Sequence, residues 1–297
     1  MTEINVALVK QLIRMQFPQW AELPIEPVLN GGWDNRTFRL GDAMSIRLPS
    51  APGYVAQVEK EHRWLPVLRP HLPLPIPVPL GLGAPAAGYP WPWSVYGWLD
   101  GKPAQPDRIR DLGRFAVDLA YFLVALRDID AREGPPAGTH NFERGGPLMV
   151  YDAQTRQSID MVTDEIDVAS VVEIWNTALA TSWKGSPVWV HGDVAASNLL
   201  VNEGRLCGVI DFGCAGVGDP SCDLVMAWTF FDPDSRIKFR ASLALDPDTW
   251  NRARGWAIWK ALITLAWLRD NPIKVEEARQ TIKNILDEPV DTTSVLV

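Results

Sequence analysis

Apolar residues recur at helical spacing along much of the chain. In the first such segment they stand at Val6, Val9, Leu12 and Ile13, and Pro18 ends the pattern. A longer amphipathic pattern covers residues 107–130. The same spacing predicts further helices over residues 54–68, 165–183, 223–231, 236–245, 248–269 and 273–287. Helices are therefore expected to dominate the second half of the chain.

Strand patterns are confined to a few short segments. Residues 28–48 alternate short apolar runs with turn signals, and Gly41-Asp42 between two runs predicts a β-hairpin. Residues 93–99 predict one more strand. Residues 70–92 hold eight prolines, which predict an extended, stiff connector because proline does not enter helix interiors or central strands.

These patterns change character near Gly97. We predict an α+β fold of two lobes, in which residues 1–97 form a small β-rich lobe and residues 98–297 a larger, mainly helical one. Two short apolar runs, residues 188–190 and 207–210, are expected to be strands within the helical lobe.

Composition and charge exclude several classes of protein. The net charge of −8 is concentrated after residue 97, where 20 Lys and Arg stand against 29 Asp and Glu. An acidic surface argues against nucleic acid as a partner and favours a cationic one. The three cysteines match no zinc spacing, residues 1–10 do not resemble a signal peptide, and the longest apolar stretch is short and contains Lys260. We expect a cytoplasmic protein that does not enter a membrane.

The candidate chemistry follows the two short strands of the helical lobe. The first runs into His191-Gly192-Asp193, and Asn198 comes five residues after Asp193. The second, which a hairpin through residues 202–204 should place alongside, runs into Asp211. Carboxylate and amide oxygens suit Mg²⁺, and a further carboxylate can accept a hydroxyl proton. The spacing is typical of phosphoryl transfer, with His191 expected to brace the loop.

The strings HGDVAASNLLV and GVIDFGCAGVGDPSCDL resemble the aminoglycoside phosphotransferase family, whose fold is protein-kinase-like. The resemblance implies transfer of the γ-phosphoryl group of ATP or GTP to a hydroxyl of a small molecule. It implies that Asp193 is the catalytic base and that Asn198 and Asp211 bind Mg²⁺. Asp219 and Asp223 are expected to brace the site.

The same resemblance assigns nucleotide contacts in the first lobe. Arg47 stands where kinases place a lysine, and Glu61, with Glu59 as the second choice, matches the helix glutamate that holds that cation. The remaining implied contacts are a glycine loop and a hinge: Asn30, Gly31 and Gly32, then Tyr96, Gly97 and Leu99.

Several alternatives stay open at this point. A protein kinase would need a longer segment after Asp211, and a Rossmann dehydrogenase would need a Gly-x-Gly-x-x-Gly motif that is missing. A nucleotide-binding pseudokinase is the third alternative. The acidic stretch 151–173 suits an aminoglycoside or another amine, while macrolides and small metabolite alcohols remain candidate acceptors. The sequence does not indicate an oligomeric state.

Overall fold

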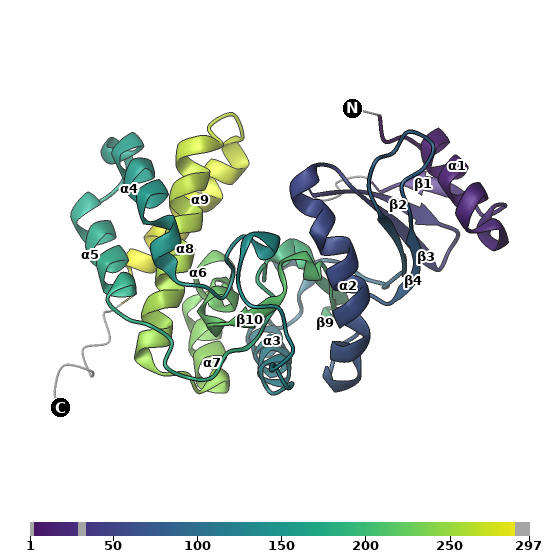
Figure 1. Cartoon of the computed structure of the whole chain (residues 1–297). Helices are drawn as coiled ribbons and strands as arrows, with labels where there is room; N and C mark the ends of the chain where they lie inside the picture. Colours follow the sequence, from purple (N-terminus) through teal and green to yellow (C-terminus); the bar gives the residue numbers. More distant parts are fainter. Residues whose placement is uncertain (1–2, 29–33, 289–297) are drawn as a thin grey trace.

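The computed structural model describes residues 3–28 and 34–288 and has two lobes. The N-lobe is an antiparallel sheet in the order β1-β2-β3-β5-β4 (Figure 1). Its strands are β1 (Ile25–Pro27), β2 (Asn35–Leu40), β3 (Met44–Pro49), β4 (Pro79–Gly83) and β5 (Trp93–Gly97). The predicted α+β, kinase-like architecture is confirmed.

Local sequence accounts for the first elements of this lobe. Helix α1 (Val6–Gln16) begins where the Asn5 side chain accepts the backbone N–H of Leu8, and it buries Val9, Leu12 and Ile13 against the sheet. The predicted hairpin joins β2 to β3, and Gly41 in its turn has the positive φ of +57° that glycine adopts most easily.

Helix α2 (Val55–Leu68) lies on the side of the N-lobe that faces the C-lobe (Figure 1). It buries Leu65 and Leu68 in the core of the C-lobe, and the charged Glu61 is 5% exposed. Helix α2 therefore brings a buried acid to the boundary between the lobes.

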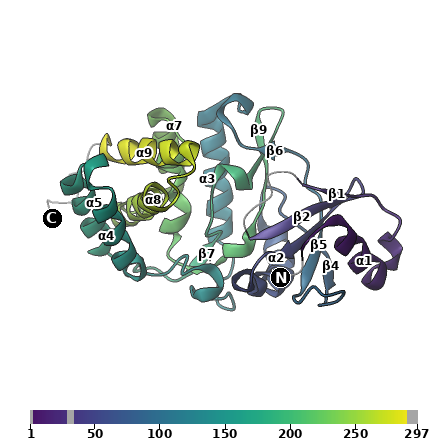
Figure 2. The ribbon, with the colours of Figure 1, turned by 90° about the horizontal axis from the view of Figure 1, so that it is seen from above.

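The C-lobe is built around helix α8 (Pro247–Trp267). It lies between α9 (Pro272–Leu286) on one side and α4 (Asp152–Met161) and α5 (Val168–Leu179) on the other (Figure 2). Helix α3 (Leu112–Arg127) packs against α7 (Pro233–Leu243), and the short α6 (Met226–Thr229) contacts α9. None of the described helices is long and apolar enough to cross a lipid bilayer.

Two small sheets support the loops of the C-lobe. Strand β7 (Val188–Val190) pairs with β10 (Gly216–Gly218). The expected hairpin through residues 202–204 joins β8 (Leu199–Asn202) to β9 (Arg205–Val209), and β6 (Lys102–Pro103) adds to β8. The two strands expected from their apolar runs, β7 and β9, thus lie in different sheets.

Two expectations need correction, and one helix was not predicted. The proline-rich connector contains β4, which proline tolerates because β4 is an edge strand and begins at Pro79. Helix α3 begins at Leu112 rather than 107, because Asp111 caps it after a separate 3₁₀ turn. Helix α4 was not expected, since its sequence is mostly polar and shows no long apolar stripe.

Candidate functional site

The loop after β7 is held by a buried aspartate. Both carboxylate oxygens of Asp223 accept backbone N–H groups, from His191 and Gly192, at 2.7 Å each. Gly192 has φ +81°, and a Cβ there would lie 2.3 Å from the Cys214 carbonyl oxygen. The expected bracing role of Asp223 is therefore seen in the structure, and this position requires glycine.

His191 braces the same loop from inside. It is fully buried, its Nε2 lies 3.0 Å from the Ile210 carbonyl, and its Nδ1 accepts the backbone N–H of Asp193 at 3.2 Å. An Nδ1 that accepts leaves a ring proton on Nε2, which donates to the Ile210 carbonyl. The histidine thus links the loop of Asp193 to the end of β9.

Asp193 has two side-chain partners. Asn198 Nδ2 donates to the Asp193 carboxylate at 3.1 Å and to its backbone carbonyl at 2.9 Å. Lys260 Nζ on α8 donates to the other carboxylate oxygen at 3.0 Å. Burial raises the pKa of Asp193, but the Lys260 ammonium outweighs it with the help of other cations, and the net pKa is lowered. Asp193 is therefore an ionised, oriented carboxylate.

The β8–β9 hairpin brings Asn198 and Asp211 together. Asn198 directly precedes β8, and its carbonyl accepts the backbone N–H of Ile210 at 2.9 Å. Asp211 follows Ile210 with φ +69° and ψ +65°, a left-handed conformation that is strained for a non-glycine residue. Its carboxylate accepts Arg47 Nη2 at 2.7 Å. The two predicted metal ligands, Asn198 and Asp211, thus share one site with Arg47, the predicted phosphate-binding cation.

Arg47 on β3 is surrounded by acids. Besides Asp211, its guanidinium lies 3.5 Å from Glu61 and 3.8 Å from Asp34. Burial raises the pKa of Glu61, against the influence of Arg47, and burial together with the Asp211 charge raises the pKa of Asp34. Glu61 also accepts the Tyr96 hydroxyl at 2.5 Å, whereas Glu59 is exposed. The structure therefore favours Glu61 over Glu59.

This arrangement fits a divalent cation. Three carboxylates share one guanidinium, so negative charge exceeds positive charge around Asp211, and the raised pKa of Asp34 partly reflects that excess. The described residues contain no group of three or more His, Cys, Asp or Glu side chains that would coordinate a metal ion unaided. Asn198 and Asp211 would supply two oxygens, which suits Mg²⁺ because Mg²⁺ completes its shell with phosphates and water.

The predicted hinge is only partly available. Tyr96 is 2% exposed and donates its hydroxyl to Glu61, so its side chain is a packing and bracing group. The Gly97 N–H is donated to the Val78 carbonyl at 2.9 Å, which takes that amide away from a purine edge. The Leu99 amide has no backbone acceptor in the described part of the chain. Asn30, Gly31 and Gly32 lie outside the described residues.

Sequence reasoning missed two cations beside Asp193. A pocket next to the carboxylate is lined by Asp193, Lys260, Arg144, Trp256 and Trp259, which come from the β7 loop, α8 and the loop before α4. Arg144 and Lys260 lie 49 and 67 residues from Asp193 in the sequence, and no local motif marks either one. Only the fold brings them to the same place.

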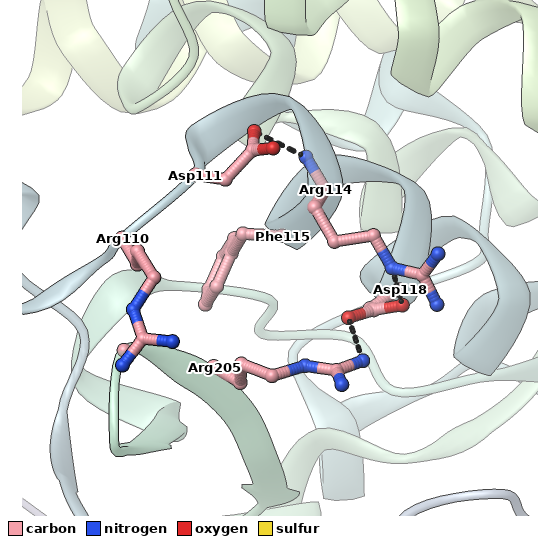
Figure 3. Close-up of a pocket in the computed structure, with 7 residues that line it drawn as sticks. Arg110, Asp111, Arg114, Phe115, Asp118 and Arg205 are labelled. Carbon is pink, nitrogen blue, oxygen red and sulfur yellow. Dashed lines mark hydrogen bonds and ion pairs between the residues drawn. The ribbon is translucent and has the colours of Figure 1, made fainter.

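A second, more open cavity of about 340 Å³ lies elsewhere, at the start of α3 and the β8–β9 turn (Figure 3). Asp118 lies there between Arg114, at 2.9 Å, and Arg205, at 3.4 Å. Its lining contains none of Asp193, Asn198 or Asp211. We therefore assign the chemistry to the site around Asp193.

Comparison with solved structures supports the fold. A GDP complex of a variant aminoglycoside 2'-phosphotransferase IIIa superposes with a TM-score of 0.72 and 19% identity over 95% of this chain and 97% of the other. A macrolide 2'-phosphotransferase from Brachybacterium faecium gives a TM-score of 0.61 and 20% identity over 96% and 98%.

Sequence comparison gives partial matches. An aminoglycoside 3'-phosphotransferase of Salmonella typhimurium is 28% identical over 152 residues, and one of Escherichia coli is 39% identical over 66 residues. The alignments cover 48% and 21% of this chain, and span only 54% and 24% of those relatives. The APH model, described as the phosphotransferase enzyme family, matches residues 26–256. This match covers most of the chain and includes Arg47, Glu61, Asp193, Asn198 and Asp211, whereas Trp259 and Lys260 lie just beyond it. The chain therefore belongs to the phosphotransferase enzyme family.

Proposed function

We propose that this protein transfers the γ-phosphoryl group of ATP or GTP to a hydroxyl group of a small molecule. One observation carries the proposal: an ionised Asp193 hydrogen-bonded to Asn198, which the β8–β9 hairpin joins to Asp211. A base and two oxygen ligands within one hydrogen-bonded unit are what in-line phosphoryl transfer needs from a protein.

Each residue of the site has a separate role in the proposed phosphoryl transfer. Asp193 orients the acceptor hydroxyl and takes its proton as the oxygen attacks the γ-phosphorus. The bond between the γ-phosphorus and its bridging oxygen breaks, and the nucleoside diphosphate leaves. Asn198 Oδ1 and the Asp211 carboxylate would hold Mg²⁺, which neutralises phosphate charge when bound. Arg47, held by Glu61, would bind the α- and β-phosphates through its two-pronged guanidinium.

We propose that Leu99 and the Asn30-Gly31-Gly32 loop also contact the nucleotide, and that the two lobes meet close to Gly97, where β5 ends. The GDP bound to one structural neighbour and the ADP bound to another support a nucleotide site but leave the choice between ATP and GTP to experiment. Three free cysteines, Cys207, Cys214 and Cys222, support a reducing compartment such as the cytoplasm.

A protein kinase is the weaker alternative. After Asp211 the chain forms β10 and then a 3₁₀ helix from Pro220 to Leu224, which is followed directly by α6. Asp219 begins that turn and pairs with Arg252 at 2.6 Å, so the segment is short and anchored in the C-lobe. A segment of this kind offers no platform for a peptide substrate.

The molecule that accepts the phosphoryl group is to be identified by experiment. The names of the relatives and structural neighbours make aminoglycosides and macrolides the first compounds to test. Three of the six acids in the stretch that favoured a cationic acceptor are engaged in structural contacts. Asp152 pairs with Arg156, Glu165 pairs with Arg269 and Arg279, and Asp167 caps α5.

The test is a transfer assay with γ-labelled ATP and GTP, with and without Mg²⁺, across aminoglycosides, macrolides and hydroxylated metabolites. We expect Mg²⁺-dependent phosphorylation of at least one acceptor, together with slow NTP hydrolysis when no acceptor is present. If nucleotide binds but neither hydrolysis nor transfer occurs, the protein is a pseudokinase and the proposal fails.

A further inference from the structure

The acceptor side of Asp193 has a positively charged, aromatic wall. We use the name acceptor pocket for the small hollow, of about 10 Å³, that is lined by Arg144, Asp193, Trp256, Trp259 and Lys260. Tyr151 completes the wall from outside, because its ring centroid lies 4.1 Å from that of Trp259. The pocket therefore combines flat apolar surfaces with charged groups next to the proposed catalytic base.

Arg144 has no acidic partner. No Asp or Glu of the described residues lies within 4 Å of its guanidinium, and its buried Nε has no hydrogen-bond acceptor there. The guanidinium instead rests on two rings, 4.7 Å from the Trp259 centroid and 5.0 Å from the Trp256 centroid. Stacking fixes the position of the guanidinium but satisfies none of its N–H donors.

A second donor in the same wall is also without an acceptor. The indole Nε1 of Trp256 is buried and unpaired among the described residues, whereas the neighbouring Trp259 donates its Nε1 to Gln154 at 2.9 Å. Buried donors in folded proteins are nearly always paired, so two unpaired donors in one pocket indicate a missing acceptor.

The charges that line the pocket indicate that the missing acceptor is negatively charged. Two cations, Arg144 and Lys260, line the pocket with one carboxylate, Asp193, and Lys260 already pairs with it at 3.0 Å. Arg144 is therefore the cation of the pocket that has no ion-pair partner among the described residues. The acids of residues 151–173 do not line the pocket, and those with ion pairs are matched to arginines outside it.

We propose that the acceptor alcohol carries an anionic group, most simply a carboxylate, attached to a flat or apolar body. The proposal rests on the proposed phosphotransferase function. The carboxylate accepts hydrogen bonds from Arg144 and from the Trp256 indole N–H, the body packs on the aromatic rings, and the hydroxyl meets Asp193. Arg144 acts as a specificity residue for the acceptor.

The test compares matched alcohols that differ only in charge. Each set holds a carboxylate, its primary amide and the corresponding amine, built on 4-(hydroxymethyl)benzoate, 4-(hydroxymethyl)cyclohexanecarboxylate and 4-hydroxybutanoate. Binding to the full chain is measured by calorimetry with Mg²⁺ and ADP present, and kanamycin serves as a polycationic comparison. We expect at least one carboxylate to bind about tenfold or more tightly than its amide and its amine.

Variants identify the group responsible. Arg144→Gln should remove the preference for the carboxylate, and Arg144→Lys should retain part of it because the charge remains while the fork is lost. Trp256→Phe keeps the ring, removes only the N–H, and should weaken carboxylate binding a few-fold. Arg156→Gln is the matched control, because Arg156 pairs with Asp152 outside the pocket and its loss should leave the preference unchanged.

Three outcomes would overturn the inference. In the first, no carboxylate binds better than its amide in any of the three sets. In the second, the amines or kanamycin bind best. In the third, Arg144→Gln weakens all members of a set equally, which would indicate that Arg144 shapes the pocket and does not recognise the carboxylate. None of these results bears on the proposed reaction, which Mg²⁺-dependent NTP hydrolysis tests without an acceptor.

Discussion

Arg47 links the two halves of the site through a single side chain. Its guanidinium reaches Glu61 on α2 and Asp211 after β9, so one planar group touches a helix of the N-lobe and a loop of the C-lobe. The charges of Asp211 and Glu61 outweigh the effect of burial and hold the pKa of Arg47 well above its usual value. The planar guanidinium of arginine can donate hydrogen bonds to two carboxylates in fixed directions. The compact ammonium of a lysine cannot reproduce that geometry.

We therefore expect Arg47→Lys to lower kcat/KM for the nucleotide by about tenfold, and Arg47→Met to lower it further, because each step removes charge-assisted hydrogen bonds. Steady-state kinetics with varied nucleotide measures both. Arg36→Lys is the matched control, since Arg36 is exposed on the neighbouring strand β2. Equal kinetics for Arg47→Lys and the wild type would show that the fork has no role.

Residue types at fixed spacing predicted much of the site, but not all of it. Asp193 and Asn198 are five residues apart, and Asp211 follows a recognisable strand, so local sequence sufficed for their contacts. Arg144 and Lys260 reach the pocket only because α8 and the loop before α4 fold over it. A lone arginine or lysine in a helical or loop segment has no pattern that distinguishes it from a surface cation.

At the scale of elements, the loop after β7 depends on glycine and a buried acid. Gly192 has a positive φ and no room for a Cβ, and Asp223 satisfies two backbone amides that have no solvent contact. These contacts hold Asp193 at the end of its strand. The downstream hydrogen-bond partners of the loop are Asp223, in the 3₁₀ helix after β10, and Ile210, which follows β9, so residues distant in sequence position this loop.

Gly192→Ala should destabilise the fold by about 2–4 kcal/mol, because the new Cβ would meet a backbone carbonyl and the backbone would be strained. Urea unfolding followed by circular dichroism measures the change. Gly53→Ala is the matched control, since no atom lies within 4 Å of a Cβ built there and its φ is not positive. Equal losses in the two variants would contradict this account of the loop.

Sequence patterns located most elements and missed those that depend on tertiary pairing. The long helices α3 and α8 and the β2–β3 hairpin follow from periodicity and turn residues. Strand β4 was not predicted because it lies among the prolines of the connector, and it forms because it pairs with the edge of β5. Helix α4 was hidden by its polar sequence, and it forms where its few buried residues pack on α8.

At the scale of the whole molecule, two contacts from the N-lobe converge on one segment of the C-lobe. Arg47 binds Asp211, and Lys60 on α2 donates to the carbonyl of Gly213 at 2.7 Å. Lys60 also contacts His140, which lies in the loop that leads to Arg144. The two lobes are thus joined at the residues that form the site.

Lys60 makes this junction sensitive to pH. Burial lowers its pKa from 10.5 to about 8 in the folded protein. Between these values the unfolded chain binds more protons than the folded one, so the contribution of Lys60 to stability rises with pH and is lost as pH falls through 8. We expect the unfolding free energy of the wild type, relative to Lys60→Met, to rise by about 2 kcal/mol between about pH 7.5 and 9.5.

Denaturant unfolding of the wild type and of Lys60→Met across this pH range gives the difference in unfolding free energy directly. The contributions of the other titrating groups are common to both proteins and largely cancel. Lys10→Met, at an exposed position of α1, is the control and should show no such rise. A flat difference for Lys60→Met would mean that Lys60 titrates normally and is not desolvated at the junction.

The central claim is that Asp193 is the base of a phosphoryl transfer. Asp193→Asn keeps the size and most hydrogen-bonding capacity of the side chain but cannot accept the hydroxyl proton. The decisive measurement is the turnover of labelled phosphoryl transfer to the best acceptor, made alongside nucleotide binding by calorimetry. The account predicts that transfer falls by about 10²–10⁴-fold while nucleotide affinity stays within about threefold of the wild type. Near-normal turnover in Asp193→Asn would contradict it.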